Sequence, residues 1–116
     1  MEVLLLRQAN GARRPMPTDF VEMIWSHWDK GTGAAVLALY RHADPDDLAR
    51  AGSDLAKLTC PSLVLWGDRE PYFPIRFAEA YAAVLPDAQL EIVAGAGHWP
   101  WIDDARVIDD VLSFIG

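Results

Sequence analysis

Hydrophobic positions in the first half of the chain recur at the spacing of amphipathic helices. Phe20, Ile24 and Trp28 fall at i, i+4 and i+8, which predicts a helix over residues 19–30 with one aromatic face. Thr18 is its candidate N-cap. Packing against neighbouring helices is the favoured interpretation of the aromatic face. A substrate pocket or a partner surface are the alternatives.

Glycine and proline mark the boundaries of further short helices before residue 59. Gly31 and Gly33 are expected to end the first helix, and residues 34–42 again have a helical composition. Asp44 followed by Pro45 is typical of an N-cap and a first helical position, so another short helix is expected after them. The first half of the chain is therefore predicted to be helical.

From residue 59 the pattern changes to strands that alternate with helices. Residues 62–66 form a continuous apolar run between a proline and a glycine, which is typical of a strand buried on both faces. A second strand is predicted over residues 89–93, and helices are predicted over 74–85 and 105–115. The order strand, helix, strand, helix indicates a parallel sheet with right-handed crossovers, and so the α/β class.

Polar residues follow both predicted strands. Asp68 and Glu70 come after the first strand, and His98 lies in the glycine-rich loop after the second. Because neighbouring parallel strands bring their following loops to one edge of the sheet, these side chains are expected to lie close together. A carboxylate that orients an imidazole supplies two of the three members of a nucleophilic triad. On the residues alone, a structural and a catalytic role for His98 are equally open.

Composition indicates which kinds of binding partner and which cellular compartment are expected. The 116 residues are 52% hydrophobic and 23% charged, which fits one globular domain, and the net charge is −7. Without a basic stripe, no nucleic-acid partner is expected. Cys60 is the single cysteine and the apolar run at residues 3–6 is too short for a signal peptide core. Together these features favour a cytoplasmic protein without a membrane segment.

Metal and cofactor motifs are incomplete throughout the sequence. His27, His42 and His98 lack the spacing of metal ligands. The acidic run over residues 44–47 lacks the central glycine and terminal glutamate of a calcium loop. The Gly-x-Gly pair in the first half lacks the third glycine of a dinucleotide fingerprint and follows a predicted helix. We therefore expect no metal and no cofactor.

A resemblance to a known family rests on two segments, CPSLVLWGDREPYFP and LPDAQLEIVAGAGHWP. They resemble the C-terminal part of the α/β-hydrolase superfamily, in its cap-bearing branch. In that family a buried strand ends in Gly-x-x-Asp and the next strand ends in a Gly-His loop. The resemblance is close over residues 59–116 and looser over 18–58. It implies a helical cap-like segment over residues 1–58, followed over 59–116 by the last two parallel strands of a hydrolase core with their flanking helices.

The resemblance also implies roles for individual residues. His98 matches the family's general base, and Glu70 matches the acid, at a position where aspartate is usual. Glutamate offers the same carboxylate with one more methylene. Asp68 is the alternative acid, although a turn-forming role is favoured for it. The pocket beside the histidine is expected to be bordered by aromatic residues, namely Trp99, Trp101, Tyr72 and Phe73.

The family's nucleophile lies on a Gly-x-Ser-x-Gly elbow, and this sequence has no such motif because no two of its glycines are four residues apart. We therefore expect a C-terminal part of a hydrolase that begins within or just before its cap. In the intact arrangement it would act on a small-molecule substrate, an apolar ester or a related compound. Whether the chain is itself an enzyme stays open. The alternative is an inactive fragment or a non-enzymatic module that self-associates or pairs with a missing N-terminal half.

Overall fold

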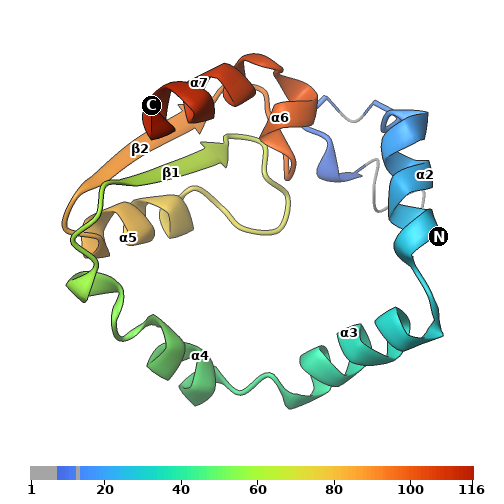
Figure 1. Cartoon of the computed structure of the whole chain (residues 1–116), viewed down its shortest axis with the longest axis horizontal. Coiled ribbons are helices and arrows are strands. Elements are labelled where there is room, and N and C mark those ends of the chain that lie inside the picture. Colours follow the sequence, from blue (N-terminus) through green and yellow to red (C-terminus); the bar gives the residue numbers. More distant parts are fainter. Residues whose placement is uncertain (1–7, 13) are drawn as a thin grey trace. The chain divides into compact units, whose positions relative to one another are not determined.

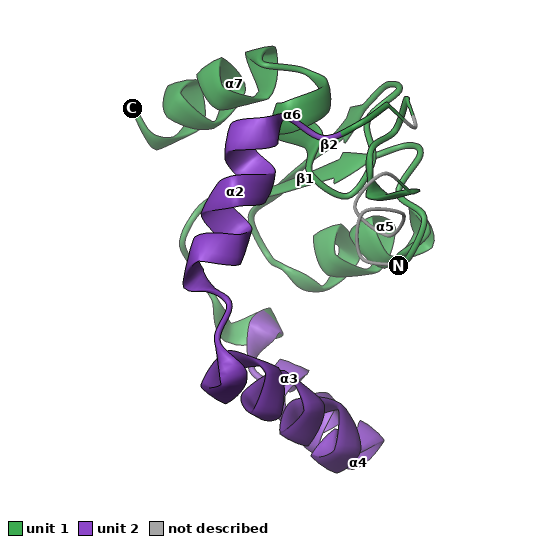
Figure 2. Ribbon diagram, turned by 90° about the vertical axis from the view of Figure 1, so that its right-hand side faces the viewer, with its two compact units in different colours: residues 1–15, 56–116 green, residues 16–55 purple. Residues whose placement is uncertain are grey.

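The computed structural model describes residues 8–12 and 14–116, and the apolar run at residues 3–6 lies outside them. The chain divides into two compact units, coloured green and purple in Figure 2. Unit 1 comprises residues 1–15 and 56–116, and unit 2 comprises residues 16–55. Each is described by itself below.

Unit 2 is helical, as predicted. It contains α2 (Thr18–His27), α3 (Lys30–His42) and α4 (Pro45–Gly52), which follow one another along the chain in Figure 1. None of the residues in these three helices is buried, and Tyr40 on α3 is 79% exposed. Local hydrogen bonds and end caps, rather than a core of their own, therefore define these helices.

The start of α2 differs from the prediction. Thr18 is the first helical residue, and Pro17 takes the N-cap position without a side-chain hydrogen bond. The carbonyl of Pro17 accepts the first helical hydrogen bond, from Val21 N at 3.1 Å. Because the proline ring fixes φ, the backbone sets the direction in which the chain enters the helix. Asp19 lies in the first turn, where its negative charge interacts favourably with the positive end of the helix dipole.

The break between α2 and α3 also lies elsewhere than predicted. Gly31 and Gly33 were expected to end a helix, but both lie in the first turns of α3. Asp29 is the N-cap, and its Oδ1 accepts from Thr32 N at 2.6 Å and from the Thr32 hydroxyl at 3.0 Å. These hydrogen bonds lower the pKa of the Asp29 carboxyl. A good cap satisfies the free N–H groups at this end, which offsets the low helix propensity of the glycines.

The next helix start matches its prediction. Asp44 is the N-cap of α4 and accepts from Asp46 N at 2.7 Å, with Pro45 at the first helical position. A 3-10 turn, η1 (Leu55–Lys57), then leads toward the first strand. Proline in the first turn costs no hydrogen bond because that N–H has no partner within the helix.

Unit 1 contains the α/β part of the fold. The strands β1 (Ser62–Gly67) and β2 (Ala88–Val93) pair in parallel, with a register that runs from Ser62 opposite Ala88 to Gly67 opposite Val93. The crossover between them is α5 (Arg76–Val84). Strand β2 is followed by α6 (Pro100–Asp103) and α7 (Arg106–Ile115). Figures 1 and 2 show α5 and α7 on opposite faces of the strand pair.

The core of unit 1 is small and lies next to the ends of the strands. Val93, Ala96 and Val107 form a buried cluster, against which Leu65 packs. Val107 comes from α7, so the cluster fixes the last helix against the end of β2 and the loop that follows it. The short helix α6 was not predicted; it lies between the glycine-rich loop and the predicted last helix. Four residues are too few to show a helical periodicity in the sequence.

Candidate active site

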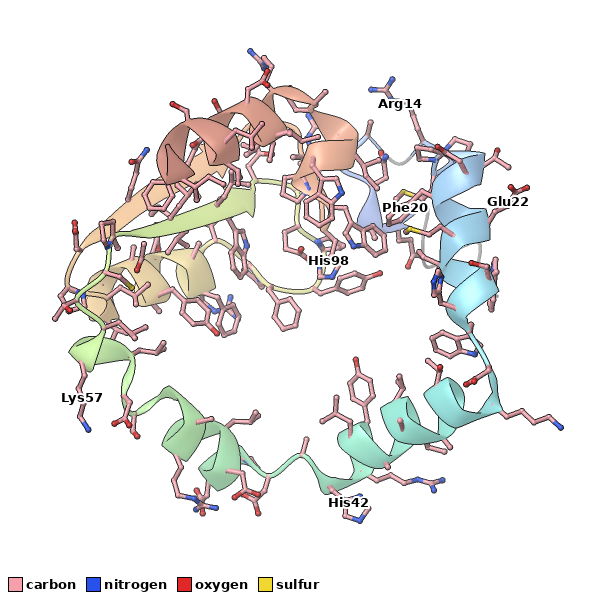
Figure 3. All side chains as sticks on the ribbon, in the orientation of Figure 1. Arg14, Phe20, Glu22, His42, Lys57 and His98 are labelled. Carbon is pink, nitrogen blue, oxygen red and sulfur yellow. The ribbon has the colours of Figure 1, made fainter. Side chains whose placement is uncertain are left out.

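The candidate site lies where the loops that leave β1 and β2 meet. Asp68 N donates to the carbonyl of Val93 at 3.1 Å, and Arg69 N donates to the carbonyl of Ala96 at 2.9 Å. These hydrogen bonds continue the strand pairing beyond its last register pair. They hold the segment before Glu70 beside the segment before His98, and Figure 3 shows His98 next to the loop that follows β1.

Glu70 and His98 are in direct contact. Oε2 of Glu70 lies 2.6 Å from Nδ1 of His98, and the glutamate side chain is 6% exposed while the histidine side chain is 34% exposed. An ionised carboxylate only accepts hydrogen bonds, so this contact favours the tautomer that carries its proton on Nδ1. Nε2 then has a free lone pair, and it has no hydrogen-bond partner among the described residues. The pair can therefore take up a proton at Nε2.

The second oxygen of Glu70 is held by the backbone of its own loop. Oε1 accepts from Tyr72 N at 2.6 Å and from Phe73 N at 3.3 Å. One carboxylate oxygen therefore faces two N–H donors and the other faces the imidazole. This arrangement fixes the side-chain rotamer without any further side-chain partner.

Asp68, the alternative acid, has a different partner. Its Oδ1 accepts from Gly95 N at 2.6 Å. Gly95 has a φ of 79°, a conformation that glycine adopts readily. Asp68 thus connects the two loops through the backbone, and the structure brings Glu70 rather than Asp68 to the ring of His98.

Two glycines allow the backbones around the site to approach closely. A Cβ at Gly67 would lie 2.3 Å from the carbonyl oxygen of Ala96, and one at Gly97 would lie 2.2 Å from the carbonyl oxygen of Ala9. The N–H of His98 donates to the same Ala9 oxygen at 2.7 Å. The histidine loop is therefore in contact with β1 on one side and with the segment around residue 9 on the other.

Aromatic rings surround the imidazole. Tyr72 and Trp99 meet the His98 ring edge-on, with centroids 5.1 and 5.2 Å away. Phe73 lies more nearly parallel to it, at 6.3 Å and an interplanar angle of 29°. All three were expected to border a pocket at this position; Phe73 lines the cavity described next, whereas Tyr72 and Trp99 contact the ring but are not among its lining residues. These rings cover part of the imidazole, whose side chain remains 34% exposed.

A cavity of about 360 Å³ adjoins the pair. Its lining is mostly apolar and combines β1, the two loops, α6 and α7; it includes Leu63, Leu65, Trp66, Phe73, Trp101 and Val107 beside Glu70 and His98. Trp66 was predicted only as part of a buried strand, yet its Nε1 donates to the carbonyl of Phe73 at 2.8 Å. A tryptophan at the end of an apolar strand, just before the polar loop, was the only sequence signal for this role.

The serine hydroxyl groups described here bond to nearby backbone carbonyls rather than to His98. Ser26, Ser53 and Ser62 each donate to a backbone carbonyl two or three residues away, and Cys60 is exposed before β1. Ser26 also contacts His27 at 3.0 Å, but both are exposed neighbours on α2. In the part of the chain that the structure describes, no serine, threonine or cysteine is hydrogen-bonded to His98. The described site thus contains an acid and a histidine without a nucleophile.

The described residues contain neither a cluster of potential metal ligands nor a helix that could span a membrane. No three histidine, cysteine, aspartate or glutamate side chains gather as potential metal ligands within residues 8–12 and 14–116. None of the helices described there combines the length and the apolar character that a membrane span requires.

A carboxylate and a histidine on the loops after two neighbouring parallel strands are typical of one class of enzyme fold, the α/β hydrolases. The family model described as "Alpha/beta hydrolase family" matches residues 3–110. The chain therefore belongs to the α/β-hydrolase family, which confirms the fold class and the resemblance inferred from the sequence.

Similar proteins include hydrolases with named substrates. A 2-hydroxy-6-oxononadienedioate/2-hydroxy-6-oxononatrienedioate hydrolase from Cupriavidus pinatubonensis is 32% identical over 75 residues, which are 64% of this chain and 26% of that protein. A 2-hydroxymuconate semialdehyde hydrolase from Pseudomonas putida is 30% identical over 84 residues, 69% of this chain and 30% of that protein. An uncharacterized protein from Mycobacterium tuberculosis is 43% identical over 56 residues, 47% of this chain and 16% of that protein. The chain thus spans less than a third of each of these relatives.

Solved structures show the same fold. An α/β-hydrolase enzyme from the metagenome of lagoon sediments at Mar Chica, Morocco, superposes with a TM-score of 0.59 at 23% identity, over 83% of this chain and 43% of that one. A protein proposed to be a lipase, from Acinetobacter baumannii, superposes with a TM-score of 0.66 at 22% identity, over 96% of this chain and 39% of that one. At these identities the likeness concerns the fold alone.

Proposed function

We propose that this chain supplies the acid and the histidine of an α/β-hydrolase catalytic triad. The observation that carries the proposal is the 2.6 Å contact between Oε2 of Glu70 and Nδ1 of His98, with the carboxylate buried and the imidazole partly exposed. Buried carboxylate–imidazole pairs of this kind fix the tautomer and stabilise the imidazolium that forms during catalysis. Family membership supports the same roles.

The reaction would proceed by nucleophilic catalysis. His98 takes a proton at Nε2 from a hydroxyl nucleophile or from water, while the nucleophile attacks the carbonyl carbon of the substrate. Glu70 stays ionised and stabilises the imidazolium through Nδ1–H. His98 then returns the proton to the leaving group, and a second cycle with water releases the acid product. The nucleophile is contributed by a segment other than the described residues.

The proposed substrates are small and largely apolar. A cavity of about 360 Å³ beside His98 matches a small organic molecule, and its lining is mainly aliphatic and aromatic. Simple esters are one class of substrate. Unsaturated oxo acids are a second class, more polar because of their carboxylates; they are included because two relatives are hydrolases of 2-hydroxy-6-oxononadienedioate and 2-hydroxymuconate semialdehyde.

The sequence predicts a cap-like part over residues 1–58 and a core part over 59–116. The cap proposal concerns the helices of unit 2, residues 16–55, because Ala9 and Gly11 contact the histidine loop within unit 1. Three features support this proposal. The helices α2, α3 and α4 bury none of their own residues, they expose large apolar side chains such as Leu39 and Tyr40, and only the turn η1 separates them from β1 in the element order. Exposed apolar side chains of this kind suit a surface that covers a substrate.

The test combines this chain with a separately expressed upstream half of a related hydrolase that carries a Gly-x-Ser-x-Gly elbow. Hydrolysis of p-nitrophenyl esters and of 2-hydroxymuconate semialdehyde is measured for the reconstituted pair. We expect turnover that His98→Ala abolishes and that His42→Ala leaves unchanged, because His42 is an exposed residue at the end of α3, labelled in Figure 3. Equal rates for His98→Ala and the unsubstituted chain would contradict the assignment. The chain alone is expected to show no burst of acyl-enzyme.

A second candidate function is pairing with another protein surface. Large apolar side chains are exposed on α7, among them Ile108, Leu112 and Ile115. Exposed apolar patches mark contact surfaces in many proteins. Light scattering on the isolated chain tests this: dimers or larger species support pairing with a second copy, and a monodisperse monomer that melts cooperatively counts against it.

A further inference from the structure

The carboxylate of Asp103 joins two backbone segments that are far apart in the sequence. Its Oδ2 accepts from Gly97 N at 2.8 Å and from Gly11 N at 2.9 Å. Asp103 is the last residue of α6 and is half-buried. In the sequence it stands shortly before the helix predicted over residues 105–115. The contact with Gly11 spans 92 positions, so no local pattern could indicate it.

Both segments that Asp103 holds are in contact with the histidine loop. Gly97 immediately precedes His98, and the N–H of His98 donates to Ala9 at 2.7 Å. Gly11 lies two residues after Ala9, and a Cβ on Gly97 would lie 2.6 Å from Gly11 N. One carboxylate oxygen thus bridges the two sides of a contact that has no space for a side chain. The bridge therefore holds the segment around Gly11 against the residue that precedes His98.

The negative charge of Asp103 strengthens the two hydrogen bonds that it accepts. Hydrogen bonds from N–H groups to a carboxylate are shorter and stronger than those to a neutral oxygen. Two such bonds converge on Asp103, whereas Glu70 is held by the N–H groups of Tyr72 and Phe73 in its own loop. The two partners of the acid–histidine pair therefore have separate anchors. Glu70 is anchored within the loop after β1, and His98 is anchored through Asp103.

We propose that Asp103 is a positioning residue for His98. It contacts neither the imidazole nor the cavity, and it acts through the backbone of Gly97 and of the segment around residue 11. By fixing this backbone it keeps Nδ1 of His98 within hydrogen-bond distance of Glu70. The importance of this distance for catalysis rests on the proposed function, but the positioning itself can be measured without any turnover.

The neighbouring aspartate provides a matched control. Asp104 carries the same charge one position further along, and it accepts from Arg106 N at 3.0 Å and from the Arg106 guanidinium. These contacts lower the pKa of the Asp104 carboxyl. They lie at the start of α7 and not in the histidine loop. Substitutions at Asp104 therefore remove the same charge and affect the start of α7, while the hydrogen bonds of Asp103 stay in place.

The experiment compares the full chain with D103A, D103N, D104A and D104N, all labelled with ¹⁵N. Two signals are measured by NMR: the Nδ1 proton of His98, and hydrogen exchange of the backbone amides of Gly97 and His98. In D103A we expect the Nδ1 proton signal to broaden or disappear, and amide exchange to become about tenfold faster or more, since a charged acceptor is lost. D103N should lie between the full chain and D103A, because its amide oxygen still accepts both N–H groups. D104A and D104N should match the full chain.

The outcomes separate the inference from the proposed function. Exchange rates and an Nδ1 proton signal in D103A like those of D104A would overturn the positioning role. If D103A does not fold, D103N decides: exchange several-fold faster than in D104N supports the role, and equal exchange overturns it. In the reconstituted hydrolase, D103A should lower kcat with little change in KM. If the NMR effects occur but His98→Ala keeps full activity, the proposed function fails and the positioning role stands.

Discussion

The two oxygens of the Glu70 carboxylate face opposite partners, and the one turned away from the imidazole accepts from Tyr72 N at 2.6 Å. The other lies 2.6 Å from Nδ1 of His98. A side chain that reaches both partners must span the distance from its own loop to the loop after β2. The extra methylene of glutamate, relative to the aspartate usual at this position, supplies that reach.

Shortening or neutralising this side chain should therefore have separable effects. In the reconstituted hydrolase, Glu70→Gln should lower kcat by about 10³- to 10⁴-fold, because a neutral amide no longer stabilises the imidazolium. Glu70→Asp should also lower kcat, by a smaller factor, since aspartate cannot keep both contacts. Steady-state kinetics measures both, with the exposed Glu79→Gln as the control. Wild-type kcat in Glu70→Asp would contradict this account of the reach.

Two glycine substitutions should change stability in opposite directions. Gly97→Ala places a Cβ 2.2 Å from the carbonyl oxygen of Ala9, so backbone must move, and we expect a loss of about 2 kcal/mol or more. Gly33→Ala lies in α3 with only the Trp28 ring nearby, at 3.7 Å, and should raise helix stability by up to about 1 kcal/mol. Thermal unfolding followed by circular dichroism measures both. Equal melting temperatures for the two variants would rule out the close approach at Gly97.

The indole of Trp66 should stabilise the acid-bearing loop. Its Nε1 donates to the carbonyl of Phe73 at 2.8 Å, and Trp66→Phe removes this donor while it keeps an aromatic ring. We expect a loss of about 1 kcal/mol in the free energy of unfolding, together with faster exchange of the Tyr72 and Phe73 amides. Urea titration and hydrogen exchange measure these effects. The exposed Trp25→Phe, which lies on α2, serves as the control and should change neither.

Stability should depend on pH through Glu91. Burial, and then the neighbouring charge and hydrogen bond of Asp110, raise the pKa of the Glu91 carboxyl. The folded state thus binds this proton more tightly than the unfolded state, so the contribution of Glu91 to stability falls as pH rises through its folded pKa. Glu91→Gln should flatten that fall and raise the melting temperature at neutral pH relative to the full chain.

The comparison for Glu91 is Asp110→Asn, which removes the neighbouring charge but leaves the burial of Glu91. It should reduce the pH dependence only in part. Melting curves at several values between pH 4 and pH 8 (roughly the range over which a raised glutamate pKa titrates) measure the effect. The same dependence of the melting temperature on pH in the full chain and in Glu91→Gln would show that Glu91 does not contribute.

The strands could be predicted closely from the sequence because their signal is local. The apolar run at residues 62–66, predicted as a strand, is β1 (Ser62–Gly67), and the strand predicted at 89–93 is β2 (Ala88–Val93). Parallel pairing then follows from the intervening helix, and it brings the loops of Glu70 and His98 to one edge. The preference for Glu70 over Asp68 came from the family resemblance, and the structure shows Glu70 in contact with the ring.

Other features could not be predicted because they depend on contacts distant in sequence or on competing local effects. Asp103 and Gly11 meet only in the folded chain. Asp29 caps α3 strongly enough for Gly31 and Gly33 to lie within the helix, although glycine propensity alone predicts a break. The catalytic roles of Glu70 and His98 and the cap role of the helical segment stay predictions that the experiments above test.

The strand register has a consequence for how the chain could be observed as it folds. A slip of one residue between β1 and β2 would displace one loop along the other by about 3.3 Å, more than the length of a hydrogen bond, and would reverse the faces of the strand side chains. Glu70 and His98 can therefore meet only when Gly67 lies opposite Val93. The Nδ1 proton of His98 would then serve as a reporter of correct strand alignment, visible in real time during refolding.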